Sequence, residues 1–146
     1  MVDAAGIEKV IPHRGDMRLI DEIREFDDRS GVGIHYVRDD EFWCAGHFPG
    51  KPIMPGVLQI EALAQTACFI ALTMLGATDG NTLGYFTTVD KAKFTHMVKP
   101  GDVLELHVEL LMNKMRLYKF YGVAMVGDKK VAEATFSAIM QPRDQE

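Results

Sequence analysis

The segment 55–75 constrains the fold more than any other part of the chain. Apolar residues occupy nearly every face of this predicted helix, which would span about six turns at 3.6 residues per turn. A helix that is apolar all round is either enclosed by other structure or spans a membrane. Gln59, Glu61 and Gln65 lie inside the segment, and charged groups at bilayer depth are costly. We therefore expect a helix buried in a protein core.

The ends of this helix also have sequence signals. Pro55 suits the first helical position, where its missing N–H costs nothing. Gly76 suits the C-terminal cap, because glycine readily adopts the left-handed conformation found there.

Most of the remaining chain has the composition and the period of two that favour β-strands. A short helix is predicted at 4–10, and strands are predicted at 19–26, 31–37, 82–94, 104–110, 116–126 and 131–140. Strands that outnumber helices without βαβ alternation indicate the α+β class. We expect about six strands, mostly antiparallel, curled around the central helix in the hotdog arrangement.

Composition sets further limits on the protein. A length of 146 residues predicts one domain, 1–146. The net charge of −5 argues against general nucleic-acid binding. Cys44 and Cys68 lack metal-ligand spacing and are too few for a disulfide framework. The first residues do not resemble a signal peptide, so we expect a cytoplasmic protein that does not enter membranes.

A stiff loop, GHFPGKPIMPG at 46–56, precedes the helix. Its three prolines fix their own φ angles and push the residues before them towards extended conformations. His47 therefore has little freedom, and catalysis needs a rigidly supported titratable side chain. At the helix start, Gly56 and Val57 offer N–H groups without an intrahelical partner, as an oxyanion hole requires.

Glu61 lies about 7.5 Å along the helix axis from Gly56, at 1.5 Å per residue. Gln65 follows at i+4 on the same face and could orient the carboxyl group. Apolar surroundings should raise the pKa of Glu61, and a protonated acid opposite the neutral imidazole of His47 makes a general acid–base pair.

Structural explanations exist for each residue alone. A single histidine beside glycine is more often structural or exposed, and a buried salt bridge would account for Glu61 about as well as catalysis. The combination of rigid loop, free amides and buried acid favours a site. His13 has no acid partner near it in sequence, which favours a structural or tunnel-edge role. For the remaining histidines we expect exposed strand positions: His35, His96 and His107.

The chain resembles the FabZ-type β-hydroxyacyl-acyl carrier protein dehydratases. The family signature GHFPGxPxMPGVLxxEAxAQ is matched from Gly46 to Gln65 at every fixed position. The related FabA-type enzymes carry Asp at the position of Glu61, which favours simple dehydration here. One departure is Gly15-Asp16-Met17, where the family usually has Tyr-Pro-Phe after PHR; that tyrosine is described as gating the substrate tunnel. Chain-length preference is therefore left open.

The resemblance implies a mechanism on a (3R)-3-hydroxyacyl thioester carried by the phosphopantetheine of acyl carrier protein. His47 removes a proton from C2, the Gly56 amide stabilises the thioester oxygen, and Glu61 assists departure of the 3-hydroxyl group. No metal or redox cofactor is implied. The family also implies a homodimer whose sites combine histidine from one subunit with glutamate from the other, with three dimers in a hexamer.

Acyl carrier protein is acidic, so cations should surround the tunnel mouth. The candidates for docking are Lys91, Lys93 and Lys99, although each is as typical of a solvated strand. The candidates for the acyl tunnel, which are equally typical of an ordinary core, are Met54, Ile60, Phe86, Phe94 and Met97.

Two alternative functions remain on this evidence. A hotdog thioesterase binds the same thioester and can also carry an acid on its helix. A non-catalytic acyl-carrier-binding module would retain the fold but would have no need of a buried acid.

Overall fold

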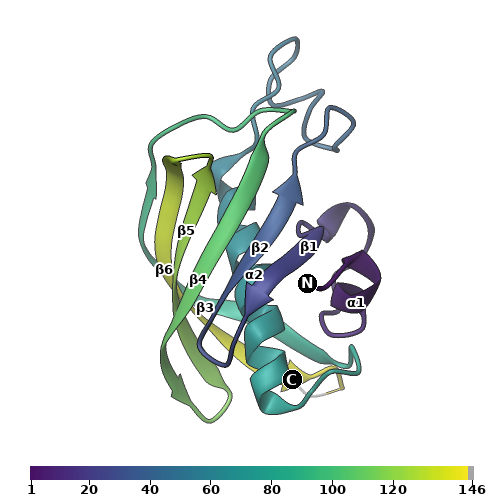
Figure 1. Cartoon of the computed structure of the whole chain (residues 1–146), viewed down its shortest axis with the longest axis vertical. Coiled ribbons are helices and arrows are strands. Elements are labelled where there is room, and N and C mark those ends of the chain that lie inside the picture. The colour runs from purple at the N-terminus through teal and green to yellow at the C-terminus, as the bar shows by residue number, and fades with distance from the viewer. Residues whose placement is uncertain (145–146) are drawn as a thin grey trace.

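The computed structural model describes residues 1–144 and contains a six-stranded antiparallel sheet around one long helix. The helix α2 (Gly56–Leu75) runs along the concave face of the sheet (Figure 1). The strands are β1 (Glu22–Phe26), β2 (Ser30–Tyr36), β3 (Thr82–Phe94), β4 (Val103–Lys114), β5 (Leu117–Val126) and β6 (Lys129–Pro142). Two short elements precede them, α1 (Ala4–Glu8) and the 3-10 turn η1 (Gly15–Met17). The predicted α+β hotdog architecture is confirmed.

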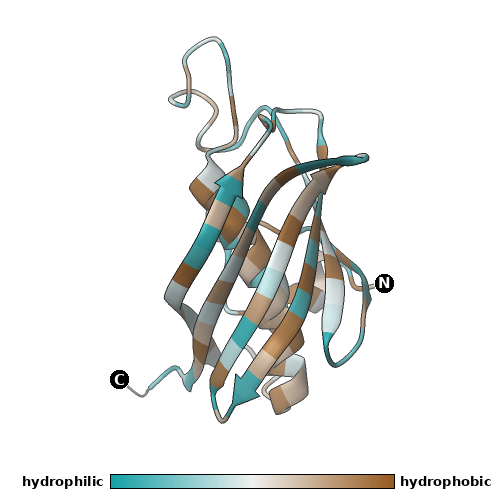
Figure 2. Ribbon diagram, turned by 90° about the vertical axis from the view of Figure 1, so that its left-hand side faces the viewer, coloured by the Kyte–Doolittle hydropathy of each residue, from teal (hydrophilic) through white to brown (hydrophobic). Residues whose placement is uncertain are grey.

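The spatial order of the strands is β1-β2-β4-β5-β6-β3, so β1 and β3 form the two edges of the sheet. Apolar and polar residues alternate along several strands (Figure 2), and the burial of β4 and β5 follows this alternation. From Tyr85 onwards, every residue of the edge strand β3 is exposed.

The core forms where α2 packs against β2, β4, β5 and β6. Twelve helical residues are buried, from Gln59 to Leu72, which confirms that protein covers this apolar segment. The helix meets the sheet closely at Gly31, where an added Cβ would lie 2.7 Å from Ile70 Cδ1. A side chain at Gly31 would therefore force helix and sheet apart.

The ends of α2 differ slightly from the sequence prediction. Pro55 is the N-cap residue rather than the first helical residue, and Gly56 begins the helix. Gly76 is the C-terminal cap, with φ 75°, and its N–H bonds to the carbonyl groups of Leu72 and Thr73. This cap confirms the role predicted for Gly76.

The bounds of β1, α1 and β4 differ more from those predicted from the sequence. β1 begins at Glu22 rather than at residue 19, because the N–H of Leu19 donates to the Gln65 side chain and not to a neighbouring strand. The helix α1 ends at Glu8 rather than at residue 10. β4 extends to Lys114, and the turn that follows contains Met115 with φ 56°.

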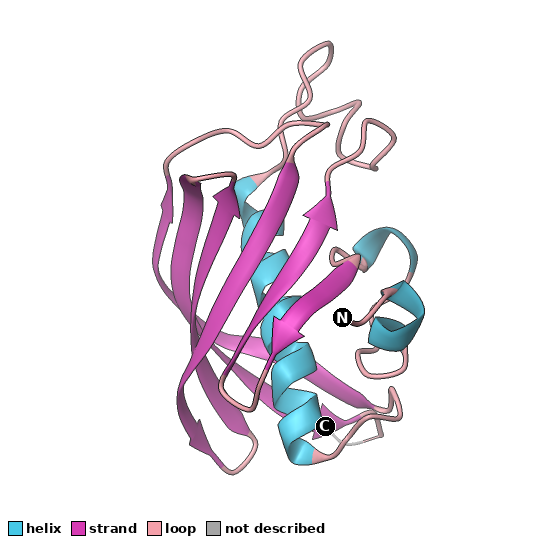
Figure 3. Cartoon of the chain, viewed as in Figure 1, coloured by secondary structure: helices cyan, strands magenta, loops and turns pink. Residues whose placement is uncertain are grey.

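Two long loops meet at one end of the sheet (Figure 3). One joins β2 to α2 and contains residues 37–55; the other joins β3 to β4 and contains residues 95–102. They are joined by a hydrogen bond from Met54 N–H to the Val98 carbonyl, 2.7 Å long. This bond fixes the end of the first loop to the second.

Candidate active site

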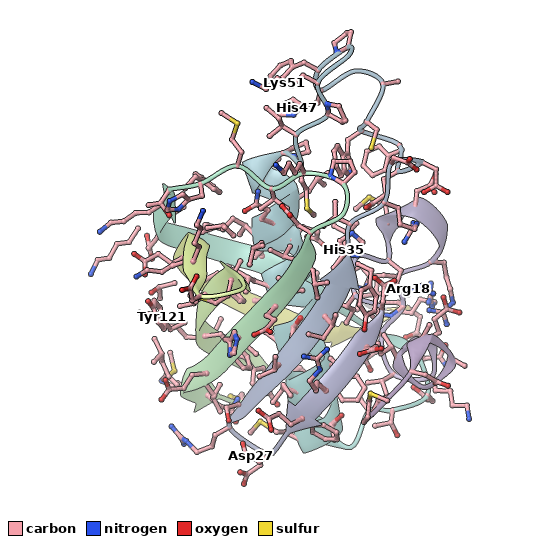
Figure 4. All side chains as sticks on the ribbon, turned by 45° about the horizontal axis from the view of Figure 1, so that its top comes forward. Arg18, Asp27, His35, His47, Lys51 and Tyr121 are labelled. Carbon is pink, nitrogen blue, oxygen red and sulfur yellow. The ribbon has the colours of Figure 1, made fainter. Side chains whose placement is uncertain are left out.

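His47 lies on the loop that projects beyond the sheet (Figure 4). Its backbone is held on both sides, since His47 N–H bonds to the Trp43 carbonyl and its own carbonyl accepts from Ile53 N–H at 2.7 Å. The turn beyond it is closed by reciprocal backbone hydrogen bonds between Phe48 and Lys51. The rigidity expected from the prolines and glycines of this loop thus has a hydrogen-bonded basis.

The imidazole of His47 is held in one tautomer. Nδ1 lies 2.7 Å from the Ile53 carbonyl oxygen, and a carbonyl only accepts, so Nδ1 carries the hydrogen. In the neutral ring this leaves the lone pair on Nε2, which is what a general base needs. The ring also stacks on Phe48, with 4.1 Å between ring centroids.

A cavity of about 660 Å³ lies beside His47 and is here called the His47 cavity. Its lining is His47, Ile53, Met54, Gly56, Val57, Gln59, Phe94, Thr95, His96 and Met97. Three of the five predicted tunnel residues therefore belong to it: Met54, Phe94 and Met97. Both predicted amide donors, Gly56 and Val57, also lie on this cavity.

The first amides of α2 are available to a ligand. Within residues 1–144, the N–H groups of Gly56 and Val57 have no backbone partner, whereas those of Leu58 and Gln59 bond to the Pro55 carbonyl. The absence of a side chain on Gly56 has a packing reason, because an added Cβ would lie 2.7 Å from the Phe94 ring. Glycine thus allows Phe94 to pack over the helix start.

Glu61 faces a second, smaller cavity of about 150 Å³, here called the Glu61 cavity. Its lining is His13, Glu61, Ala64, Gln65, Cys68, Gly84, Tyr85, Phe86, Ala138 and Met140. Phe86 is the predicted tunnel residue found here. Ile60 is buried in the core and lines neither cavity.

The environment of Glu61 favours its protonated form. Burial raises the pKa of this carboxyl group, and a hydrogen bond from Gln65 opposes the rise only in part. Gln65 Nε2 lies 2.9 Å from Glu61 Oε2, so the side chains meet as the i+4 spacing predicts. The orienting contact is present in the structure.

His13 lines the Glu61 cavity, as the tunnel-edge interpretation predicts. The fold also gives it an acid partner that is distant in sequence, because its Nε2 lies 3.5 Å from Glu61 Oε2. No sequence signal reveals that contact, which joins the first loop to the middle of α2. The prediction for His96 was wrong in part: this residue is exposed as expected, but it follows the end of β3, and its Nδ1 faces the Lys130 carbonyl.

The prediction for His35 was also wrong, because this residue is 1% exposed. Its two ring nitrogens lie 3.0 Å from Asp21 Oδ2 and 2.9 Å from Glu41 Oε1. Burial alone would lower the pKa of His35, but the two carboxylates outweigh it and raise that pKa to about 9. The turn at 27–30 alone would place residue 21 opposite residue 36. A bulge between Ile23 and Glu25 shifts the register by one residue, so Asp21 lies opposite His35 for a reason that the sequence pattern did not reveal.

The cations predicted for docking are exposed. Lys91 and Lys93 lie at the end of β3, and Lys99 lies in the loop after it. Arg18, a less certain docking candidate from the sequence, is instead engaged by Glu8, whose Oε2 lies 2.7 Å from its guanidinium group. Within residues 1–144, no group of His, Cys, Asp and Glu side chains is arranged to hold a metal ion.

These features define a hotdog-fold protein with an imidazole on its long loop and a partly buried acid on its central helix. The family model described as a FabA-like domain matches residues 11–135. The chain belongs to this FabA-like family.

Curated relatives match nearly the whole chain. The 3-hydroxyacyl-[acyl-carrier-protein] dehydratase FabZ of Acidiphilium cryptum is 43% identical over 97% of this chain and 87% of its own length. The protein of the same name from Caulobacter vibrioides strain NA1000 is 45% identical over 95% and 88%. Among solved structures, the dehydratase heterocomplex ApeI:P from Xenorhabdus doucetiae has a TM-score of 0.81 at 17% identity. It covers 95% of this chain and 92% of its own, and at this identity it supports the fold alone.

Proposed function

We propose that this protein dehydrates (3R)-3-hydroxyacyl thioesters of acyl carrier protein to trans-2-enoyl thioesters, in fatty acid or related lipid synthesis. The observation that carries this proposal is the partly buried Glu61 carboxyl group, held by Gln65 in a chain 43–45% identical to curated 3-hydroxyacyl-[acyl-carrier-protein] dehydratases. Burial raises the pKa of this carboxyl group, and a raised pKa suits proton donation to a leaving hydroxyl group.

The proposed mechanism assigns one task to each group. His47 Nε2 takes the proton from C2, and the C2–H electron pair forms the new double bond. The Gly56 N–H, with that of Val57, stabilises negative charge on the thioester oxygen. Glu61 protonates the departing 3-hydroxyl group, which leaves as water with the C3–O electron pair. The substrate loses water without a change in overall oxidation state, so no redox cofactor is needed, and Glu61 supplies the acid assistance to the departing hydroxyl group.

The site is proposed to form between two subunits. In one protomer, His47 and Glu61 line different cavities, so one ligand would need His47 of one protomer and Glu61 of its partner. The exposed edge strand β3 supports this arrangement, because it carries exposed apolar side chains at Tyr85, Phe86 and Val89. Unpaired sheet edges of this kind readily pair with another chain.

Three such dimers would form a hexamer, in which each dimer would carry two shared sites. Lys91, Lys93 and Lys99 would attract the acidic carrier protein, since they are exposed in the segment 91–99 that also contributes Phe94 and Met97 to the His47 cavity. A cytoplasmic location is supported by two free cysteines, Cys44 and Cys68.

A substrate assay separates dehydration from the two alternatives. Incubation with a 3-hydroxybutyryl thioester should raise the ultraviolet absorbance of the conjugated enoyl product without releasing free thiol. Release of thiol would identify a thioesterase instead. A binding module would show neither change and would bind its carrier equally well after Glu61→Gln.

A further inference from the structure

Both nitrogen contacts of the Glu61 carboxyl group fall on the same oxygen. Gln65 Nε2 lies 2.9 Å from Oε2, and His13 Nε2 lies 3.5 Å from the same atom. No partner for Oε1 is present within residues 1–144, while the Glu61 side chain keeps 23% of its surface exposed. The two oxygens of this acid are therefore not equivalent.

The orientation of the Gln65 amide follows from its other contacts. Its Oε1 accepts from the N–H of Leu19 at 2.8 Å, so this atom is the oxygen. Its Nε2 then donates both to the Met17 carbonyl, at 2.7 Å, and to Glu61 Oε2. Since Oε2 receives an N–H, the acidic proton belongs on Oε1.

The same reasoning fixes the tautomer of His13. Burial, aided by the neighbouring Arg14 charge, lowers the pKa of His13 and favours the neutral ring. Because Oε2 accepts from Gln65 and carries no proton, His13 can contact it favourably only by presenting an Nε2–H. Its Nδ1, which is buried and has no partner among the described residues, is then a bare acceptor.

We propose that His13 is a positioning residue for Glu61. The Nε2–H of His13 donates to Glu61 Oε2, so the acidic proton stays on Oε1, which faces the reacting hydroxyl group. This role rests on the proposed dehydration. At 3.5 Å the contact is longer than an ordinary hydrogen bond, and contacts in unliganded sites commonly shorten when substrate packs against them.

Within one protomer, few other titratable groups among residues 1–144 face Glu61, and in the proposed dimer His47 of the partner subunit would face the same ligand. From α2 the neighbour is the buried thiol of Cys68, whose pKa burial raises to about 12. From β3 it is Tyr85, which lines the same cavity. The Arg14 guanidinium donates to the carbonyl groups of Ile11, His13 and Glu8 instead. His13 is thus the ring best placed to influence the carboxyl group.

The test compares His13→Leu, which removes the donor, with His13→Gln, whose amide nitrogen can replace Nε2. His107→Leu is the matched control, because His107 lies on β4 and lines neither cavity. In each full-length protein, carbon NMR follows the titration of the Glu61 carboxyl group. The same proteins are assayed for kcat and KM with a 3-hydroxybutyryl thioester.

Loss of an N–H donor destabilises the carboxylate, so His13→Leu should raise the Glu61 titration midpoint by about one pH unit. It should lower kcat about tenfold with little change in KM. His13→Gln should restore both values, and His107→Leu should change neither. An unchanged midpoint in His13→Leu, or equal loss of kcat in both His13 variants, would overturn the proposal.

The NMR titration does not depend on activity. If the wild-type protein dehydrates nothing, the proposed function fails, whereas a shifted midpoint would still establish the contact between His13 and Glu61. If the wild type is active and the midpoint does not move, the function stands and the role of His13 is rejected.

Discussion

His47 and Glu61 open onto separate cavities of the same protomer. The imidazole lies beside the exposed amides of Gly56 and Val57, and the carboxyl group lies beside His13 and Gln65. An acid and a base that act on adjacent carbons must meet around one ligand. This relationship makes a second copy of the chain part of the proposed chemistry.

Glu61→Gln should abolish most dehydration and also stabilise the protein. Loss of the acid should lower kcat by about 100-fold or more. The pKa of Glu61 is raised in the folded state, so its favourable contribution is full below the unfolded value and is lost as pH rises through the folded value. The Tm of Glu61→Gln should therefore exceed that of wild type at pH 8, with the difference disappearing near pH 4.

Thermal unfolding between pH 4 and pH 8 measures this effect. Glu109→Gln, an exposed substitution on β4, serves as the control and should show no such trend. Full activity in Glu61→Gln, or a Tm difference independent of pH, would contradict the role of Glu61 as a partly buried acid.

Removal of the His35 ring should lower the free energy of unfolding substantially. His35→Leu leaves two carboxylates, Asp21 and Glu41, without their shared partner, and breaking a buried pair in this way costs about 3–5 kcal/mol. Urea denaturation would measure the loss at pH 6. If the free energy of unfolding falls no more than in His107→Leu, the contacts of His35 with Asp21 and Glu41 contribute little to stability.

The same cluster predicts a pH dependence for the wild-type protein. The folded pKa of His35, about 9, exceeds its unfolded value of 6.5, so its contribution is complete below pH 6.5 and declines up to pH 9. The pKa values of Asp21 and Glu41 are lowered in the fold, so their contribution declines as pH falls through the acidic range. Denaturation from pH 4 to pH 9.5 should show this profile, and His35→Leu should lack the alkaline decline.

Charge reversal at the proposed docking surface should weaken carrier binding without altering chemistry. Replacement of Lys91, Lys93 or Lys99 by Glu should raise KM for the acyl-carrier substrate about fivefold, equivalent to ~1 kcal/mol. The kcat value and the rate with a small pantetheine thioester should stay unchanged. Lys114→Glu, at the far end of β4, is the matched control; equal effects with it would argue against a specific docking surface.

Gly56→Ala should damage the start of α2. An added Cβ would lie 2.7 Å from the Phe94 ring, so the ring or the helix must shift away from the exposed amides. We expect kcat to fall about tenfold, because oxyanion stabilisation depends on donor geometry. The double variant Gly56→Ala/Phe94→Leu should recover part of the loss, and no recovery would place the damage elsewhere.

Local patterns allowed most of the fold to be predicted. The period of two in the strands and the all-round apolarity of α2 are sufficient for a sheet wrapped around a helix, and the bounds of β3 were predicted without error. The error at β1 has a physical cause. Leu19 and Ile20 are apolar and buried, so they resemble the start of a strand. The Leu19 N–H, however, bonds to the Gln65 side chain rather than to a neighbouring strand.

The site was less predictable because its contacts join segments that lie far apart in the sequence. The contact of Gln65 with Glu61 follows from helical spacing and could be inferred from sequence. The contact of His13 with Glu61 depends on how the first loop packs against α2, which no local pattern specifies. The division of His47 and Glu61 between two cavities is likewise a property of the assembled fold.

Subunit complementation tests the central claim most directly. His47→Ala and Glu61→Ala should each be inactive; refolding them together in equal amounts should restore about a quarter of wild-type activity. Half of randomly formed dimers would be mixed, and each mixed dimer would contain one intact site of two. Activity near this level would support a site shared between subunits, whereas mixed dimers that form and remain inactive would contradict it.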